Sequence, residues 1–176
     1  MRKVKRKETT HKEPMNSNKR IFLIAAIGVI AVVVTILMII ENQSGKIRVT
    51  NNTDLKLEDL KAYFVNAEGR MEEITYEYTN VEPGRKQSKG LNEINLLGRE
   101  ANLEIRFKFE GYEHKYVVDA GLFNDKFDGK INISFGKAEE GLISMKVKAS
   151  NGFLSSRLIT CDEEYKIDYQ KGELIE

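Results

Sequence analysis

The sequence predicts an all-β domain, an antiparallel β-sandwich, that follows one N-terminal transmembrane α-helix. Two observations carry this prediction. An uninterrupted apolar run occupies residues 21–40. Beyond it the hydrophobic period changes to two, with turn residues at intervals of about 8–12 positions, which is typical of sandwiches built from about seven or eight short strands. An immunoglobulin-like topology fits this pattern, and an open barrel is the alternative.

The apolar run reads IFLIAAIGVIAVVVTILMII, with no charge and with Thr35 as its only hydroxyl. At 1.5 Å per residue such a helix is about 30 Å long, the thickness of a bilayer's hydrocarbon core. A cleaved signal peptide is the competing interpretation, but its apolar region is shorter and ends in a small-x-small site. This run ends Met38-Ile39-Ile40-Glu41 and offers no such site. We therefore expect Ile21 to Ile40 to be an uncleaved signal anchor.

Residues 1–20 are basic. They carry eight Lys and Arg against two acids, a net charge of +6, which leaves −5 for the rest of a chain whose total is +1. The segment has too few apolar residues to offset its ordering entropy, so we expect a disordered tail. Lys and Arg beside a hydrophobic segment keep that end in the cytoplasm. The sequence thus predicts a single-pass plasma-membrane protein with a cytoplasmic N-terminus and an extracytoplasmic C-terminal domain.

The remainder divides into a linker and a domain. Residues 41–45 (ENQSG) form a short polar linker that keeps the domain close to the membrane, and residues 46–176 form the sandwich. The alternation is clearest at 103–109. Residues 85–101 fit either a helical turn or an irregular crossover, and about the last 20 residues fit either an edge strand or a loose tail. Alternation predicts strands near 47–49, 60–65, 73–78, 103–109, 112–118, 131–135 and 143–149.

The cysteine content bounds the class of protein. Cys161 is the only cysteine, which excludes an intramolecular disulfide and a multi-cysteine metal site. An exported domain without disulfides suits a Gram-positive bacterium. Cys161 would be an inert thiol or would bridge two chains, since neither neighbour activates it. The absence of tryptophan and of a cysteine pair also excludes a true immunoglobulin domain.

The residues that could carry chemistry do not form a set. His114 has no second histidine in the domain, so neither a histidine triad nor a zinc site can be assembled. Residues 124–129 have the Asp-Gly pair of a calcium loop, but Lys126 at position 3 of such a loop and Phe135 at position 12 stand where oxygen ligands are needed. Acidic pairs such as Glu163-Glu164 sit in polar segments. We therefore predict no enzyme, no catalytic residue, no cofactor and no metal.

Four tyrosines are the candidate binding surface. Tyr76 and Tyr78 share one strand face, as do Tyr112 and Tyr116. If exposed, they would stack on sugars or contact a protein. If buried, they belong to the core, and Ile74 on the face of Tyr76 favours that alternative.

Two functions follow as expectations. The first is a non-enzymatic interaction or accessory module that contacts another envelope or membrane protein at the outer face of a bacterial plasma membrane. The second is a binding module for a small ligand or a cell-wall glycan, through exposed tyrosines or the loop 119–129. The mildly acidic domain argues against nucleic acid as a partner.

Overall fold

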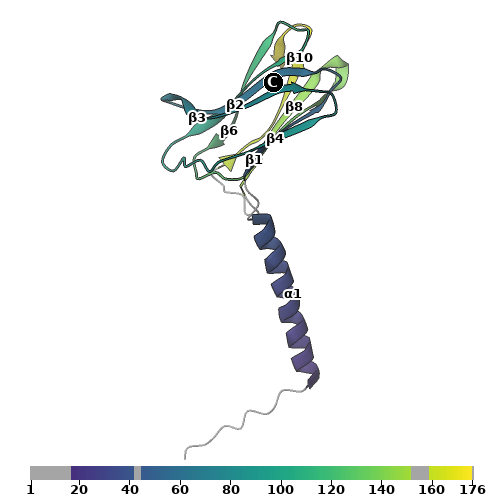
Figure 1. Ribbon diagram of the computed structural model, residues 1–176, viewed down its shortest axis with the longest axis vertical. Helices are drawn as coiled ribbons and strands as arrows, with labels where there is room; N and C mark the ends of the chain where they lie inside the picture. Colours follow the sequence, from purple (N-terminus) through teal and green to yellow (C-terminus); the bar gives the residue numbers. More distant parts are fainter. Residues whose placement is uncertain (1–16, 42–44, 152–158, 176) are drawn as a thin grey trace, which may run out of the picture. The chain divides into compact units, whose positions relative to one another are not determined.

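The computed structural model describes residues 17–41, 45–151 and 159–175 (Figure 1). The chain divides into two compact units, the first ending at Ile39 and the second beginning at Ile40. The first holds an apolar helix and the second is mostly β-sheet, in agreement with the coarse prediction from the sequence. Most of the predicted disordered tail and most of the predicted linker fall on residues 1–16 and 42–44, outside the described residues.

The helix α1 spans Ser17–Glu41, so it begins four residues before the predicted apolar run. The span Asn18–Met38 has a mean hydropathy of 3.1 and is long enough to cross a membrane. Within it, Thr35 Oγ1 donates a 2.8 Å hydrogen bond to the Ala31 carbonyl, so its hydroxyl is satisfied inside the helix. The helix is apolar on all sides, which is typical of a membrane span or of a helix buried in a large protein.

The second unit consists of two sheets (Figure 1). The six-stranded sheet has the order β11-β10-β8-β7-β1-β4, and the five-stranded sheet has the order β3-β2-β5-β6-β9. The strands are β1 Lys46–Asn52, β2 Leu57–Asn66, β3 Gly69–Val81, β4 Lys86–Gly90, β5 Ala101–Phe109, β6 Lys115–Phe123, β7 Lys130–Lys137, β8 Ile143–Ser150, β9 Ile159–Thr160, β10 Asp162–Asp168 and β11 Glu173–Ile175.

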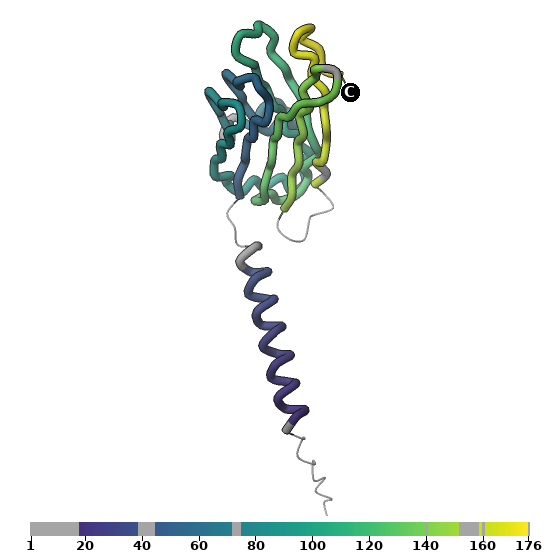
Figure 2. The backbone as a smooth tube through the Cα atoms, turned by 90° about the vertical axis from the view of Figure 1, so that its right-hand side faces the viewer, coloured from purple at the N-terminus to yellow at the C-terminus, as the bar shows by residue number. Residues whose placement is uncertain are grey.

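One strand pair departs from the antiparallel prediction. β1 pairs in parallel with β7, from Lys46 opposite Lys130 to Asn52 opposite Gly136. The other described pairs are antiparallel. Figure 2 shows the blue strand β1 beside the green strand β7. Strands so far apart in the chain are not joined by a hairpin, so no tight turn sets their relative direction.

The strand order also differs from the immunoglobulin order. There the first two strands are neighbours in one sheet and the third begins the other. Here β1 lies in the six-stranded sheet, whereas β2 and β3 form a hairpin in the five-stranded sheet. The reason is local, because the chain crosses between sheets directly after β1, where the buried side chain of Asn51 bonds the Leu55 and Val81 carbonyls.

The core fills the space between the sheets. Burial alternates along β5 as the sequence predicts, with Leu103, Ile105, Phe107 and Phe109 inside. The Phe107 ring packs edge-on against Phe135 of the other sheet, with centroids 5.0 Å apart. Aromatic pairs in this geometry add about 0.5–1.5 kcal/mol beyond their buried area.

Two segments clarify what the pattern left open. Residues 85–101 contain β4 and then an irregular stretch in which Ile94 bridges Phe127, not a helical turn. Leu91, Ile94 and Leu96 are buried there, while Leu97 is 62% exposed. Near the C-terminus, β10 pairs with both β8 and β11, so it is an inner strand of its sheet.

Candidate functional site

The outward face of the six-stranded sheet is strongly basic. The register places alternate residues of neighbouring strands on this face, because directly paired residues share a side. At its β11 edge the outward positions are Asp168 of β10 with Glu173 and Ile175 of β11. Over the rest of the face, from β4 to Lys166 of β10, seven Lys and Arg stand with two carboxylates, and the other side chains are Ser, Thr and Asn. We call this surface the basic face; it consists of Lys46, Arg48, Thr50, Asn52, Lys86, Ser88, Lys130, Asn132, Ser134, Ser144, Lys146, Lys148, Ser150, Asp162, Glu164 and Lys166.

The two carboxylates of the basic face both come from β10. Lys148 Nζ lies 2.6 Å from Asp162 Oδ2, and Lys146 Nζ lies 3.1 Å from Glu164 Oε2. These are exposed pairs, which contribute little to stability. They neutralise charge only on the β8–β10 side of the face. The outward positions of β1 and β4 carry Lys46, Arg48 and Lys86 with no acid among them.

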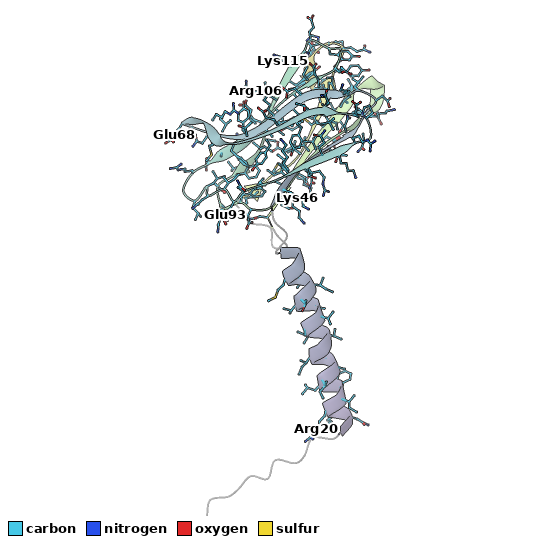
Figure 3. The ribbon with its side chains drawn as sticks, in the orientation of Figure 1. Arg20, Lys46, Glu68, Glu93, Arg106 and Lys115 are labelled. Atoms are coloured by element: carbon cyan, nitrogen blue, oxygen red, sulfur yellow. The ribbon has the colours of Figure 1, made fainter. Side chains whose placement is uncertain are left out.

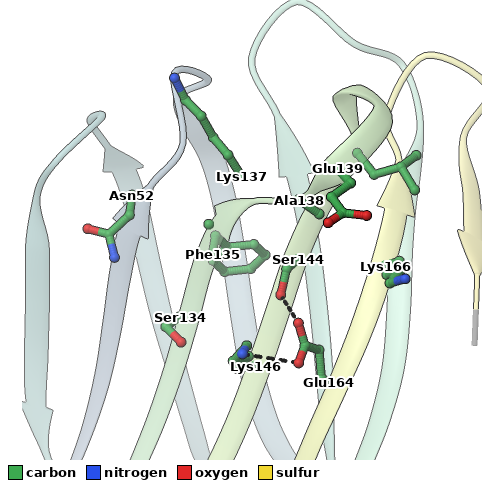
Figure 4. Close-up of a pocket in the computed structure, with 12 residues that line it drawn as sticks. Asn52, Ser134, Phe135, Lys137, Ala138, Glu139, Ser144, Lys146, Glu164 and Lys166 are labelled. Atoms are coloured by element: carbon green, nitrogen blue, oxygen red, sulfur yellow. Dashed lines mark hydrogen bonds and ion pairs between the residues drawn. The ribbon is translucent and has the colours of Figure 1, made fainter.

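A hollow of about 600 Å³ lies at one end of the basic face, beside the turn that joins β7 to β8 (Figure 4). Ser144 Oγ donates a 2.6 Å hydrogen bond to Glu164 Oε1. This bond, together with Lys146, lowers the pKa of Glu164 below its ordinary value. Lys137 and Lys166 also line the hollow. Its lining therefore combines ammonium groups with hydroxyls and an ionised carboxylate, which suits a polar ligand.

The candidate tyrosine surface is not exposed. Tyr76, Tyr78 and Tyr116 are 7%, 1% and 2% exposed and belong to the core. Tyr112 is half-buried and packs edge-on against Tyr169 at 5.2 Å. Strand alternation directs Tyr76 and Tyr78 on β3 and Tyr116 on β6 inward. Tyr112 precedes β6, which begins at Lys115, so the predicted strand 112–118 starts three residues later than expected. These tyrosines cannot serve as a stacking surface for sugars.

A second polar cluster lies on the outward face of the five-stranded sheet. The Tyr63 hydroxyl donates to Glu104, and the Arg70 guanidinium lies 4.0 Å from the centre of the Tyr63 ring. Burial alone would raise the pKa of Glu104, but hydrogen bonds from Tyr63 and Arg106 outweigh it and the pKa is lowered. Asp119, opposite Glu104, has its pKa raised by burial and then by Glu104. These contacts connect the outward side chains of three neighbouring strands, β2, β3 and β5.

The remaining chemical groups stay apart. His114 is exposed in the segment before β6. Cys161 is 4% exposed, and burial, followed by Glu163, raises the pKa of its thiol to about 12. The loop 119–129 is in part strand, since β6 extends to Phe123. Among the described residues, no group of three or more His, Cys, Asp or Glu could hold a metal ion.

Comparison with known proteins adds no identification. Protein-family models, curated proteins and solved structures contain no significant match to this chain. Function is therefore argued from geometry and charge. The sequence did not predict the basic face, because its residues come from five strands. A signal was present: Lys46 with Arg48, and Lys146 with Lys148, are pairs of bases two residues apart, which lie on the same side of a strand. Figure 3 places Lys46 and Lys115 at opposite ends of the domain.

Proposed function

We propose that this protein is a single-pass, membrane-anchored, non-enzymatic module that displays a β-sandwich at the outer face of a bacterial plasma membrane. The observation that supports it is α1. Apart from the half-buried Leu37, the large apolar side chains described on this helix are exposed, from Val34 at 43% to Phe22 at 79%. A helix of 25 residues is about 37 Å long, enough to cross the hydrocarbon core with some tilt.

The charge distribution supports the orientation. The first 20 residues carry a net +6 and include Lys19 and Arg20, which lie in the first turn of α1. Figure 3 labels Arg20 at this end of the helix. Positive charge next to a membrane span favours the cytoplasmic side. The segment after α1 carries a net charge of −4. The domain is then outside, and its role is to bind rather than to transform a ligand.

A polar ligand suits the exposed surface better than an apolar protein partner does. On β1, β4, β7, β8 and β10 no outward side chain of the basic face is apolar. Protein interfaces depend on buried aromatic and aliphatic anchors. A protein partner is the second candidate. It is favoured by Val117 and Leu122 of β6, which are 46% and 40% exposed.

Membrane retention tests the anchor. In the Val29→Lys, Val33→Lys double variant, each lysine near the helix centre costs about 3 kcal/mol of insertion free energy. We expect the native protein to stay in the membrane pellet after an alkaline carbonate wash, and the double variant to leave it. The matched Val29→Ala, Val33→Ala variant should stay. Release of the native protein by the wash would contradict the proposal.

A further inference from the structure

We propose that the basic face binds a phosphodiester polymer of the cell envelope, an anionic chain that lies across strands β4, β1, β7 and β8. This inference rests on the proposed function, since such a polymer meets the domain only outside the membrane. It names the chemical class of the ligand and the surface that holds it.

The distribution of charge is the first argument. The outward positions of these four strands carry six bases and no acid, namely Lys46, Arg48, Lys86, Lys130, Lys146 and Lys148. Lys146 and Lys148 pair with Glu164 and Asp162 of the next strand, β10, so the excess of positive charge is greatest on β1 and β4. The residues after α1 are nonetheless negative overall, at −4, with 20 Lys and Arg against 24 Asp and Glu. The net charge of the domain therefore hides one face that attracts polyanions. Long-range fields of this kind steer and orient charged ligands.

The spacing of the bases is the second argument. Alternate residues of a strand are about 6.7 Å apart, and neighbouring strands are about 4.8 Å apart. Arg48 and Lys148 stand in one cross-strand row with Asn132 between them, so their Cα atoms are separated by about 10 Å. Lys46 precedes Arg48 by two residues on β1 and lies on the same face of the sheet. The bases therefore form a two-dimensional array, which an extended chain of phosphates can contact at successive groups.

The neutral side chains are the third argument. Thr50, Asn132 and Ser134 lie between the bases. Hydroxyl and amide donors together with Lys and Arg are the groups that proteins use to hold phosphate oxygens. The same positions hold no aromatic side chain on which a neutral sugar would stack. An anionic phosphate chain therefore fits this face better than a neutral glycan or an apolar protein.

Binding by the full-length protein in phosphatidylcholine nanodiscs tests the proposal, with poly(glycerol phosphate) as the probe. The face variant is Lys46→Gln, Arg48→Gln, Lys86→Gln. The control variant is Lys61→Gln, Arg99→Gln, Lys115→Gln, which removes the same charge from residues outside the basic face. Far-UV circular dichroism confirms that both variants fold. Polyglutamate and nanodiscs that contain phosphatidylglycerol supply the competing polyanions.

We expect the native protein and the control variant to bind the polymer within twofold of each other. The face variant should bind about tenfold more weakly at 0.1 M salt, and its log–log salt slope should be shallower by about 2. Equal binding by all three proteins would overturn the proposal, as would equal losses in the two variants. Polyglutamate bound as tightly as the polymer would assign the face to acidic proteins, and binding only to anionic nanodiscs would assign it to lipid.

The result of this binding experiment can be distinguished from a failure of the proposed membrane-anchored function. The assay uses purified protein and requires no particular orientation in a cell, so it can fail while the anchor stands. Conversely, a domain found on the cytoplasmic side would overturn the assignment to an envelope polymer even if the isolated protein binds the probe.

Discussion

The Tyr78 hydroxyl, on β3, donates a 2.9 Å hydrogen bond to the backbone carbonyl of Ile47, on β1. The two residues belong to different sheets and are 31 positions apart. Tyr78 is 1% exposed, and burial raises its pKa above the ordinary value. A tyrosine that the sequence offered as a binding residue is thus a buried link between the sheets.

Removal of this hydroxyl should destabilise the domain. In Tyr78→Phe the Ile47 carbonyl loses a buried donor, so we expect the free energy of unfolding to fall by about 1–2 kcal/mol. Tyr112→Phe is the control, because the half-buried Tyr112 is accessible to water, and its effect should be below about 0.5 kcal/mol. Urea denaturation followed by circular dichroism measures the free energy of unfolding of both variants. Equal losses in the two variants would contradict a stabilising role for the bond between Tyr78 and Ile47.

Gly129 should be irreplaceable by alanine. A Cβ atom there would lie 2.0 Å from the Ser150 carbonyl oxygen, which is backbone and cannot rotate away. Gly129→Ala should therefore lower the free energy of unfolding by about 2–3 kcal/mol. At Gly136, on β7, a Cβ meets no atom within 4 Å, so Gly136→Ala should be nearly neutral. If Gly129→Ala left the free energy of unfolding unchanged, the close approach of Gly129 to Ser150 at the end of β8 would be refuted.

Asn51 should be the most sensitive polar residue of the core. Its side-chain nitrogen donates to the Leu55 and Val81 carbonyls at 2.7 and 2.8 Å, and its Oδ1 accepts from the Thr53 hydroxyl at 2.7 Å. Asn51→Ala would remove the side-chain donor to the Val81 carbonyl and the side-chain acceptor of the Thr53 amide, although the Thr53 hydroxyl would still donate to the Leu55 carbonyl. The loss should cost about 2–3 kcal/mol of unfolding free energy. The neighbouring Asn52 is exposed, and Asn52→Ala should cost less than about 0.5 kcal/mol. Comparable midpoints for the two variants would count against this account.

Cys161 should make stability fall at high pH. Burial raises the pKa of its thiol to about 12, whereas the unfolded thiol ionises near its ordinary value of 9.0. Stability from the neutral thiol is complete below pH 9 and is lost as pH rises toward 12. At pH 10 the native protein should have lost about 1–2 kcal/mol more than Cys161→Ala has, each relative to pH 7. Parallel pH profiles for the two proteins would exclude the effect.

Strong periodicity made the fold class predictable, whereas the topology depended on contacts distant in sequence. The alternation at 103–109 predicts β5 because burial on one face imposes a period of two. The parallel β1–β7 pair could not be predicted, since no hairpin joins Lys46 to Lys130. β4 reads KQSKG and lacks apolar alternation, because it is an edge strand whose residues are largely exposed.

The candidate site was less predictable than the fold. The pattern placed Tyr76 and Tyr116 on strand faces, and Ile74 on the face of Tyr76 favoured the core for that face; for Tyr116 the pattern left the choice open, and both tyrosines lie inside. The basic face is assembled from residues far apart in the chain. Arg48 on β1 and Lys148 on β8, for example, are brought near each other because β7 pairs with both strands. The net charge counted along the sequence sums this face with the acidic remainder of the domain, so the basic face does not show in that number.

The location of the domain is the central claim, and cysteine labelling tests it most directly. In a Cys161→Ala background, Leu97→Cys places a thiol at a residue that is 62% exposed, and Thr9→Cys places one in the basic tail. Intact protoplasts are treated with a membrane-impermeant maleimide. We predict labelling of Leu97→Cys in intact cells and of Thr9→Cys only after permeabilisation. The reverse pattern would contradict the account.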